Sequence, residues 1–265
     1  MKNNIYMPSK GEILSIRQES SIEWLFKVST TIKPLPGQFI QVSIPMVGEA
    51  PISVANYNHE EGWIEFLIRK VGKVTDSIFS LKVGDHLFLR GPYGNTFPLD
   101  TFKGKKLIIV AGGSGTAPVR PLIKRFIDDK ETNVELIFGF KNQESILFKE
   151  EVEEWRNKCP MILTVDKGCG IDGECVGLVT EYIPHLQLQH EFDRLEIVIV
   201  GPPMMMKYTA LEFLKHGIPE EKVWVSFERN MSCAVGKCGH CKIDETYVCL
   251  EGPIFNYTKA KMLLD

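Results

Sequence analysis

Two patterns of apolar and polar residues follow one another along the chain. Over residues 13–90, short runs rich in β-branched and aromatic residues alternate with polar positions, as in 39–44 and 63–68. Turn residues such as Pro34, Pro36 and Gly37 separate these runs. Alternation with a period of two, broken by regular turns, is typical of antiparallel strands. This region therefore predicts an antiparallel β-barrel.

The pattern changes after a second cluster of turn residues at 91–95. Continuous apolar runs follow at 107–111, 134–138, 161–165, 197–200 and 223–225, and segments with helical spacing separate them. One such segment, 204–216, ends at Gly217, a typical residue after a helix. Parallel strands are continuously apolar because helices cover both faces of their sheet. The second region therefore predicts an α/β domain with a doubly wound parallel sheet.

Composition narrows the function classes. The chain has 265 residues, enough for two domains and a small appendage, with 44% hydrophobic residues, 25% charged residues and a net charge of -3. This balance argues against a nucleic-acid partner. The N-terminal residues contain no apolar targeting segment, and no apolar run is long enough to cross a bilayer. We expect a cytoplasmic protein without membrane association.

Four cysteines lie close together near the C-terminus. The first three have the C-x4-C-x2-C spacing with which plant-type ferredoxins hold a 2Fe-2S cluster. Thiolates are soft ligands that suit iron, and Gly236 and Gly239 allow backbone amides to turn toward the sulfurs. The spacing predicts an iron–sulfur site, and the expected metal ligands are Cys233, Cys238, Cys241 and Cys249.

Two alternatives remain for these cysteines. Zinc also binds four thiolates, but structural zinc sites are usually built from two short knuckles, and here the segment 238–241 alone has that spacing. Unrelated buried thiols would not explain why four of seven cysteines fall within seventeen residues. An odd number of cysteines does not fit a secreted disulfide framework. We expect Cys159, Cys169 and Cys175 to have no part in the site.

A glycine-rich turn directly follows the apolar run 107–110. A strand, a glycine turn and a helix N-terminus in this order bind pyrophosphate through free backbone amides, and Pro118 is expected at the first helical position. The turn is not G-x-G-x-x-G, since Pro118 replaces the third glycine, and a turn that only allows tight packing is the alternative. A second break after 197–200 lies where open α/β sheets bind ligands. The residues predicted to bind the nucleotide are Gly112, Gly113, Gly115, Thr116, Ala117, Pro118, Gly201 and Pro202.

Taken in this order, the barrel, the glycine turn, the second break and the cysteines resemble the ferredoxin–NADP reductase superfamily over nearly the whole chain. The chain is most similar to the branch with a C-terminal cluster, which includes electron-transfer subunits of dihydroorotate dehydrogenase, of hydrogenases and of anaerobic sulfite reductase. Segments 48–54, 71–75, 231–241 and 247–257 resemble the B subunits of anaerobic sulfite reductases most. The resemblance implies an FAD-binding barrel at 1–100, an NAD(P)-binding domain at 101–226 and a 2Fe-2S domain at 227–265.

The resemblance also implies where FAD binds. The flavin motif of the family, Arg-x-Tyr/Phe-Ser/Thr, falls on Ala50–Ser53, so Ser53 keeps the hydroxyl while the arginine and the aromatic ring are absent. Arg69 and Lys73 are the nearest basic residues that could replace the arginine. Thr75 matches a pyrophosphate turn, although a plain helix cap is an alternative role. The implied FAD contacts are Pro51, Ile52, Ser53, Ile68, Arg69, Gly72, Lys73 and Thr75.

The implied activity is an NAD(P)H-dependent oxidoreductase in which no side chain acts as a catalytic acid or base. A hydride carries two electrons, a 2Fe-2S cluster accepts one, and a flavin between them can divide the pair. Glu144 would repel the 2'-phosphate of NADPH and Lys141 would attract it, and we expect NADH to be favoured.

The electron acceptor is expected on partner subunits. The resemblance implies the iron–sulfur and siroheme-type subunits of an anaerobic sulfite reductase, which reduces sulfite to sulfide. A dihydroorotate dehydrogenase or a hydrogenase is the alternative system. A non-catalytic metal-binding module that docks a partner is an alternative of a different class, and bound flavin would exclude it.

Overall fold

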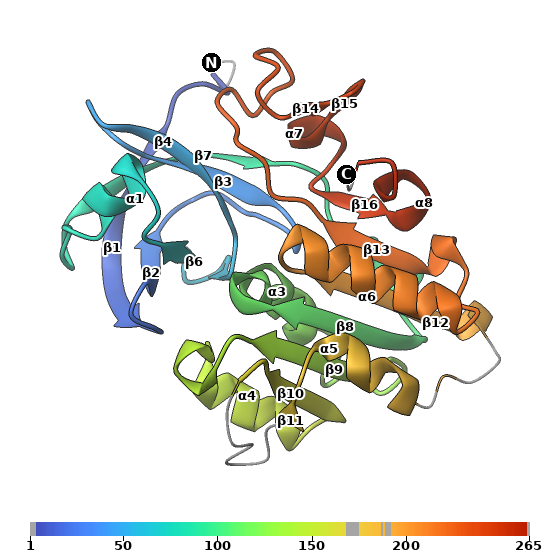
Figure 1. The fold of residues 1–265 in the computed structure, drawn as a ribbon. Helices are drawn as coiled ribbons and strands as arrows, with labels where there is room; N and C mark the ends of the chain where they lie inside the picture. Colours follow the sequence, from blue (N-terminus) through green and yellow to red (C-terminus); the bar gives the residue numbers. More distant parts are fainter. Residues whose placement is uncertain (1–3, 168–174, 187, 189–191, 264–265) are drawn as a thin grey trace. The chain divides into compact units, whose positions relative to one another are not determined.

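The computed structural model describes residues 4–167, 175–186, 188 and 192–263 (Figure 1). The chain forms two compact units: Met1–Thr96 with Glu228–Pro253, and Phe97–Phe227 with Ile254–Asp265. The cysteine segment thus belongs to the same unit as the N-terminal strands, whereas the last residues belong to the other unit. Whether 227–265 folds as a separate domain stays a prediction.

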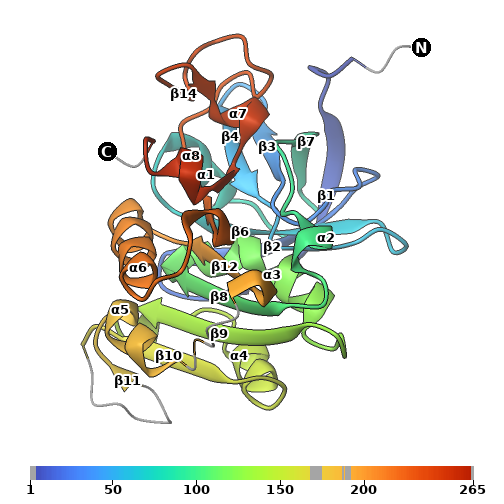
Figure 2. The same cartoon turned by 90° about the vertical axis from the view of Figure 1, so that its right-hand side faces the viewer.

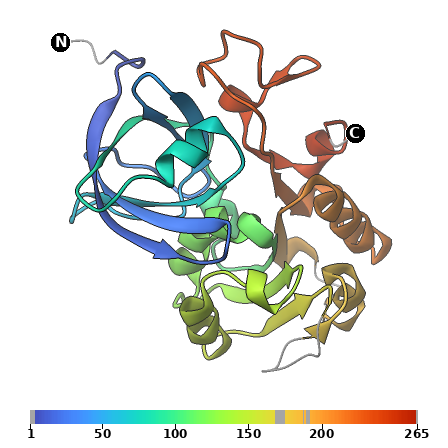
Figure 3. The same cartoon turned by 60° about the vertical axis from the view of Figure 1, so that its left-hand side comes forward.

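The first unit contains an antiparallel sheet. Its seven strands in the described residues pair in the order β4-β3-β7-β1-β2-β6-β5. Strand β4 also contacts β6, so the sheet curls on itself (Figure 3). The predicted antiparallel barrel is confirmed. The strands are β1 (Ser9–Gln18), β2 (Glu23–Ser29), β3 (Phe39–Ile44), β4 (Gly48–Ser53), β5 (Asn56–Asn58), β6 (Trp63–Arg69) and β7 (His86–Tyr93), and helix α1 is Lys73–Ile78.

Alternation along these strands builds the core of the barrel. Residues such as Phe26, Ile40 and Phe66 are fully buried in one apolar cluster. Gln41 faces the opposite side of β3, because neighbouring residues of a strand point to opposite faces, and it is nevertheless fully buried. The reason is that the cysteine segment covers this face, where Gln41 Nε2 donates to the Ser232 carbonyl.

The second unit contains the parallel sheet. Its strands pair in the order β11-β10-β9-β8-β12-β13-β16, and β16 at the edge is antiparallel to β13 (Figure 1). The strands are β8 (Lys106–Gly112), β9 (Asn133–Phe140), β10 (Met161–Val165), β11 (Cys175–Val176), β12 (Leu195–Val200), β13 (Val223–Ser226) and β16 (Ile254–Asn256). The helices are α2 (Leu99–Phe102), α3 (Thr116–Phe126), α4 (Lys149–Arg156), α5 (Val179–Tyr182), α6 (Pro203–Lys215) and α8 (Tyr257–Ala260).

Helices cover both faces of this sheet. Figure 2 shows α3 and α4 on one side of the strands and α5 and α6 on the other. From β8 the chain moves outward to β9, β10 and β11, and it then returns to β12 on the opposite side of β8. The predicted doubly wound sheet is confirmed. The carboxyl ends of β8 and β12 flank the point where the strand order reverses, and ligands bind at such points.

The cysteine segment has little regular structure. After the loop that carries Cys233, Cys238 and Cys241, strands β14 (Lys242–Ile243) and β15 (Thr246–Tyr247) form a small hairpin. Helix α7 (Val248–Glu251) follows and carries Cys249. No helix among the described residues is both long and apolar enough to cross a membrane.

Candidate cofactor sites

The loop around Cys233 directs backbone amides at its sulfur. Cys233 Sγ accepts hydrogen bonds from the amides of Val235 at 3.4 Å, Lys237 at 3.3 Å and Cys238 at 3.4 Å. The chain turns this tightly because Ala234, Gly236 and Gly239 adopt left-handed conformations, with φ of 60°, 68° and 79°. Burial raises the pKa of the Cys233 thiol, but the three amide bonds outweigh it and lower the pKa to about 7. The loop therefore stabilises the thiolate form of Cys233.

The four thiols meet as two pairs. The side chain of Cys238 hydrogen-bonds to Cys233, and that of Cys241 hydrogen-bonds to Cys249. Burial, together with the Cys241 thiol, raises the pKa of Cys249 to about 12 although its sulfur accepts from the Gly236 amide at 3.2 Å. Cys241 and Cys249 are buried, whereas Cys238 is exposed. Within the described part of the chain, no three histidine, cysteine, aspartate or glutamate side chains are arranged to hold a single metal ion.

Cys159 and Cys175 lie outside the cysteine segment. Cys159 hydrogen-bonds to the Trp155 carbonyl after α4, and burial raises the pKa of its thiol to about 11. Cys175 lies on β11. Cys169 lies outside the described residues.

The end of the cysteine segment is attached to the barrel through Asn95. Its side-chain Nδ2 donates to the Glu251 carbonyl at 2.8 Å, and its backbone amide donates to the Gly252 carbonyl at 2.7 Å. A Cβ on Gly94 would lie 2.6 Å from Pro253, so only glycine allows this approach. The sequence predicts 91–95 as the exit from the barrel, and the structure adds that this turn docks the cysteine segment.

The segments predicted to bind FAD come together on the first unit. Pro51, Ile52 and Ser53 end β4, and Ile68 and Arg69 end β6. Strand β4 contacts both β6 and α1, and Gly72 caps the N-terminus of α1. Segments that are distant in sequence thus form one region.

Two of the polar residues predicted to contact FAD, Thr75 and Arg69, already interact with neighbouring residues. Thr75 Oγ1 accepts from the amides of Val71 and Gly72 and donates to the Gly72 carbonyl, each at 3.0 Å. The helix-cap role therefore accounts for the Thr75 hydroxyl. Arg69 Nε lies 3.5 Å from Glu23 Oε1, and its side chain is 54% exposed. Lys73 is exposed on the first turn of α1.

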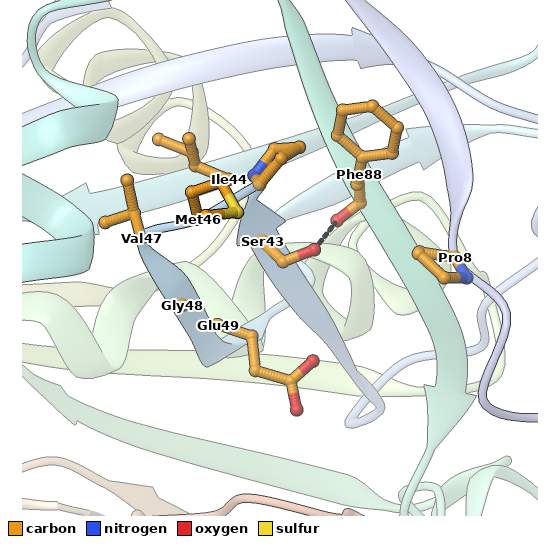
Figure 4. A pocket seen from close by; sticks show the side chains of 9 residues that line it. Pro8, Ser43, Ile44, Met46, Val47, Gly48, Glu49 and Phe88 are labelled. Carbon is orange, nitrogen blue, oxygen red and sulfur yellow. Dashed lines mark hydrogen bonds between the residues drawn. The ribbon is translucent and has the colours of Figure 1, made fainter.

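Beside the turn between β3 and β4, the same unit has a largely apolar groove of about 680 Å³. Ser43 Oγ donates to the Phe88 carbonyl at 3.1 Å across β3 and β7 (Figure 4). The groove contains a fully exposed Met46 with a φ of 65°. Its lining residues are Pro8, Ser43, Ile44, Pro45, Met46, Val47, Gly48, Glu49 and Phe88.

Two glycines of the predicted nucleotide-binding loop, Gly112 and Gly115, are required for close packing. A Cβ on Gly115 would lie 2.4 Å from the Val200 carbonyl oxygen, and one on Gly112 would lie 2.2 Å from Met205 Sδ. These glycines let the loop pack against the turn between β12 and α6, which begins Gly201-Pro202. Gly113 differs, because no described atom lies within 4 Å of its Cβ position and its φ is +53°. Tight packing thus explains Gly112 and Gly115, while Gly113 borders open space.

The predicted position of Pro118 is wrong. Gly113–Gly115 forms a 3-10 turn, so α3 begins at Thr116 and Pro118 is the third helical residue, not the first. Amides of the first helical turn have no partner within the helix, so the missing N–H of Pro118 still costs nothing. Thr116 Oγ1 donates to the Gly113 carbonyl at 2.8 Å and holds the turn to the helix.

A cavity of about 750 Å³ opens at the carboxyl edge of the parallel sheet, a typical size for a ligand site. Gly112, Gly113 and Pro202 line it, so both predicted breaks meet there. Among the described residues lining the cavity, Lys141 is present and Glu144 is not. The remaining lining residues are Gly139, Phe140, Asp166, Leu178, Val179, Thr180, Met204, Met205, Tyr208, Leu211, Glu212 and Lys215.

Sequence patterns missed Asp166. This carboxylate follows β10 directly, and the available signal was its place after the apolar run 161–165. Asp166 is thus a carboxylate at the carboxyl edge of the sheet, where open α/β sheets bind their ligands.

A curled antiparallel sheet, a doubly wound sheet with a cavity at its switch point and a cysteine-rich segment define a class of flavin-dependent and nicotinamide-dependent reductases. Three family models match the chain: an oxidoreductase FAD-binding domain at residues 19–97, an oxidoreductase NAD-binding domain at 109–210, and the iron–sulfur cluster binding domain of dihydroorotate dehydrogenase B at 228–261. The chain belongs to the ferredoxin–NADP reductase-like family of electron-transfer proteins, with FAD-binding, NAD-binding and iron–sulfur-binding domains.

Its relatives are subunits of larger complexes. Sulfhydrogenase 2 subunit gamma of Pyrococcus furiosus is 33% identical, with 97% of each chain covered. The probable dihydroorotate dehydrogenase B electron transfer subunit of the same organism is 34% identical over 87% of this chain and 83% of the relative. The structure of an NADH-dependent reduced ferredoxin–NADP oxidoreductase shares the fold, with a TM-score of 0.79, 23% identity and coverage of 100% of this chain and 94% of that chain.

These matches confirm the predicted fold and the predicted FAD, iron–sulfur and nicotinamide cofactors. They also support an oxidoreductase subunit that transfers electrons. The two relatives reported above are named as a sulfhydrogenase subunit and a dihydroorotate dehydrogenase subunit, and the finer resemblance to sulfite reductase subunits rests on the sequence segments.

Proposed function

We propose that this chain is the electron-transfer subunit of a multisubunit reductase, which takes hydride from NADH and delivers single electrons to a partner subunit. The observation that carries the proposal is the cysteine segment. Its thiols accept hydrogen bonds from backbone amides of the same segment, and Asn95 of the FAD-binding domain donates to the Glu251 carbonyl at the end of the segment.

The thiol pairs fit a 2Fe-2S cluster. Cys233 and Cys238 would hold one iron, and Cys241 and Cys249 would hold the other. Amides that already donate to Cys233 and Cys249 would offset the negative charge of the cluster. Cys238 is exposed and gives the site an edge accessible to a partner.

FAD fits the region formed by β4, β6 and α1. The residues that would contact it are Pro51, Ile52, Ser53, Ile68, Arg69, Gly72 and Lys73. The hydroxyl of Thr75 holds the turn at the N-terminus of α1. When bound, FAD supplies the chemistry that accepts a hydride and releases electrons singly. The protein's own residues bind and orient the cofactors, so no side-chain acid or base is needed.

The cavity at the switch point fits NADH. Gly113 and the first turn of α3, with Thr116, Ala117 and Pro118, would face the pyrophosphate, while Gly112, Gly115, Gly201 and Pro202 shape the loop. The Asp166 carboxylate would bind ribose hydroxyls and repel the 2'-phosphate of NADPH, and Lys141 would oppose this effect. We therefore assign the preference for NADH to Asp166, whereas the sequence pattern pointed to Glu144.

The partner supplies the terminal catalytic centre. Relatives named for sulfhydrogenase and dihydroorotate dehydrogenase favour a hydrogenase-type or dihydroorotate-oxidising partner. A sulfite-reducing partner is the second candidate, supported by segments 231–241 and 247–257.

The test begins with the anaerobically purified protein. We expect FAD, iron and acid-labile sulfide, and rapid flavin bleaching by NADH. Zinc without sulfide, or the absence of flavin, would contradict the proposal and favour the docking module. Proteins that co-purify are then added, and hydrogen evolution, orotate formation and sulfide production are measured separately. The product that appears identifies the partner system.

A further inference from the structure

Side chains of the barrel bind the backbone at the first cysteine. Arg90 Nη2 donates to the Ser232 carbonyl at 2.7 Å, and Arg90 Nη1 donates to the Cys233 carbonyl at 2.8 Å. Gln41 Nε2 donates to the Ser232 carbonyl at 3.3 Å. Gln41 on β3 and Arg90 on β7 are directly opposite each other in register. Two neighbouring strands therefore hold the Ser232 carbonyl, and Arg90 also holds the Cys233 carbonyl.

Arg90 is itself fixed. Its Nε and Nη2 bond to the two carboxylate oxygens of Glu49 on β4 at 2.9 and 2.5 Å, and Nη1 also donates to Tyr93 Oη at 3.0 Å. Each of the five N–H donors of the guanidinium is thereby used. Arg90 is 7% exposed. These bonds fix the Arg90 guanidinium in one orientation. Its bonds to the Ser232 and Cys233 carbonyls in turn fix the backbone at residues 232–233.

This geometry requires an arginine at position 90 rather than a lysine. The planar guanidinium binds a carboxylate in a bidentate manner and still directs donors elsewhere, whereas lysine is a point charge on a flexible stem. A buried ion pair contributes little net stability, although breaking it leaves an uncompensated charge. Stabilisation of the barrel alone would not require that two of the donors point at carbonyls beside Cys233.

We propose that Arg90, oriented by Glu49 and assisted by Gln41, is a positioning residue for electron transfer that fixes the first cluster ligand to the barrel and eases reduction of the cluster. The inference rests on the proposed function, in which Cys233 binds the cluster. One-electron reduction adds one negative charge to the cluster. The Arg90–Glu49 ion pair directs its guanidinium at the carbonyls of Ser232 and Cys233, and this orientation stabilises the reduced form more than the oxidised one.

The test compares matched variants of the full chain. Arg90→Met removes the charge and all donors but keeps an unbranched stem. Arg90→Lys keeps the charge and loses the bidentate geometry. Arg17→Met is the control, since Arg17 is an exposed residue of β1 in the same unit and pairs with Glu19, which directly follows the strand. The cluster is titrated with dithionite and redox mediators and followed by electron paramagnetic resonance, and the flavin potential is recorded in the same sample.

We expect Arg90→Met to disfavour the reduced cluster about tenfold at a fixed potential, which for one electron is about 59 mV. The flavin potential and the Arg17→Met cluster should match the wild type. Arg90→Lys should keep the potential but broaden the cluster spectrum, because the ligand is no longer held in one orientation. Wild-type potential and line shape in both Arg90 variants would overturn the proposal.

If Arg90→Met loses the cluster while it keeps FAD, the positioning role is supported directly. If that variant fails to fold, Arg90→Lys and Glu49→Gln decide: unchanged spectra in both overturn the proposal, and altered spectra support it. The titration uses a chemical reductant, so it remains informative even if NADH does not reduce the flavin. A flavin that NADH does not reduce would contradict the proposed function, but it would leave the proposal about Arg90 unaffected.

Discussion

The cysteine segment and the glycine-rich loop both carry a spacing that predicts a cofactor, yet their residues have different tasks. In the cysteine segment, amides of Val235, Lys237 and Cys238 point at a sulfur, an arrangement that serves a bound metal. In the glycine loop, Gly112 and Gly115 are needed because protein atoms press against them. A spacing can therefore report a ligand in one region and close packing in another.

The largest effect is expected for the cysteine segment. Cys241→Ser should abolish the cluster, because a buried hydroxyl is a poor ligand for iron. Flavin reduction by NADH should stay within about twofold of the wild type, since the nucleotide cavity is lined by residues of the other unit. Iron and sulfide analysis with stopped-flow bleaching measures both. Cys159→Ser is the matched control and should keep the cluster; a full cluster in Cys241→Ser would refute the ligand assignment.

Substitutions in the glycine-rich loop can separate close packing from nucleotide binding. Gly115→Val should destabilise the fold by roughly 2–3 kcal/mol, since the new side chain collides with the Val200 carbonyl. Gly113→Val has open space and pays about 1–2 kcal/mol for its left-handed backbone.

Gly113→Val should nevertheless slow flavin bleaching by NADH at least about tenfold while FAD stays bound, because it blocks the approach of the pyrophosphate. Urea unfolding and stopped-flow absorbance distinguish these outcomes. Unchanged bleaching in a folded Gly113→Val protein would remove the nucleotide from this loop.

A smaller change is expected at Asp166. Asp166→Asn should shift the preference for NADH over NADPH by about tenfold toward NADPH, because one negative charge near the 2'-phosphate is lost. Glu144→Gln, on the 3-10 turn at Gln143–Ser145, is the control and should leave the preference unchanged. The ratio of kcat/KM for the two nucleotides is measured with ferricyanide as acceptor. A shift in the control alone would restore Glu144 as the discriminating residue.

The smallest change concerns Thr75. Thr75→Val should cost about 1 kcal/mol of stability through loss of the cap on α1, with FAD content preserved. Thr75→Ser should retain most of that stability. Loss of FAD from a folded Thr75→Val protein would instead make the hydroxyl a flavin ligand.

Local patterns account for most of the fold. The run 39–44 coincides with β3 and 161–165 coincides with β10, because burial and alternation are properties of neighbouring residues. The cysteine spacing is local in the same sense. Gln143 and Glu144, by contrast, follow β9 in sequence but do not line the cavity among its described residues, since the chain leaves that edge after Lys141.

What sequence patterns could not predict depends on distant contacts. Arg90 and Cys233 are separated by 143 residues, and no spacing rule joins a barrel strand to a loop of the cysteine segment. The same holds for Asn95 and Glu251, which are 156 residues apart. Thr75 shows that one residue can fit both a family motif and a local structural role: its hydroxyl caps its own helix, and its contact with the flavin stays a prediction.

In the proposed function, electrons pass from NADH through the flavin to the cysteine-bound cluster of this chain. The most direct measurement mixes the anaerobic protein with NADH and freezes samples over time for electron paramagnetic resonance, while absorbance follows the flavin. We expect the reduced-cluster signal to rise after the flavin bleaches in the wild type. In Cys241→Ser, the flavin should bleach and no cluster signal should appear. A cluster that stays oxidised in the wild type while its flavin is fully reduced would contradict the account.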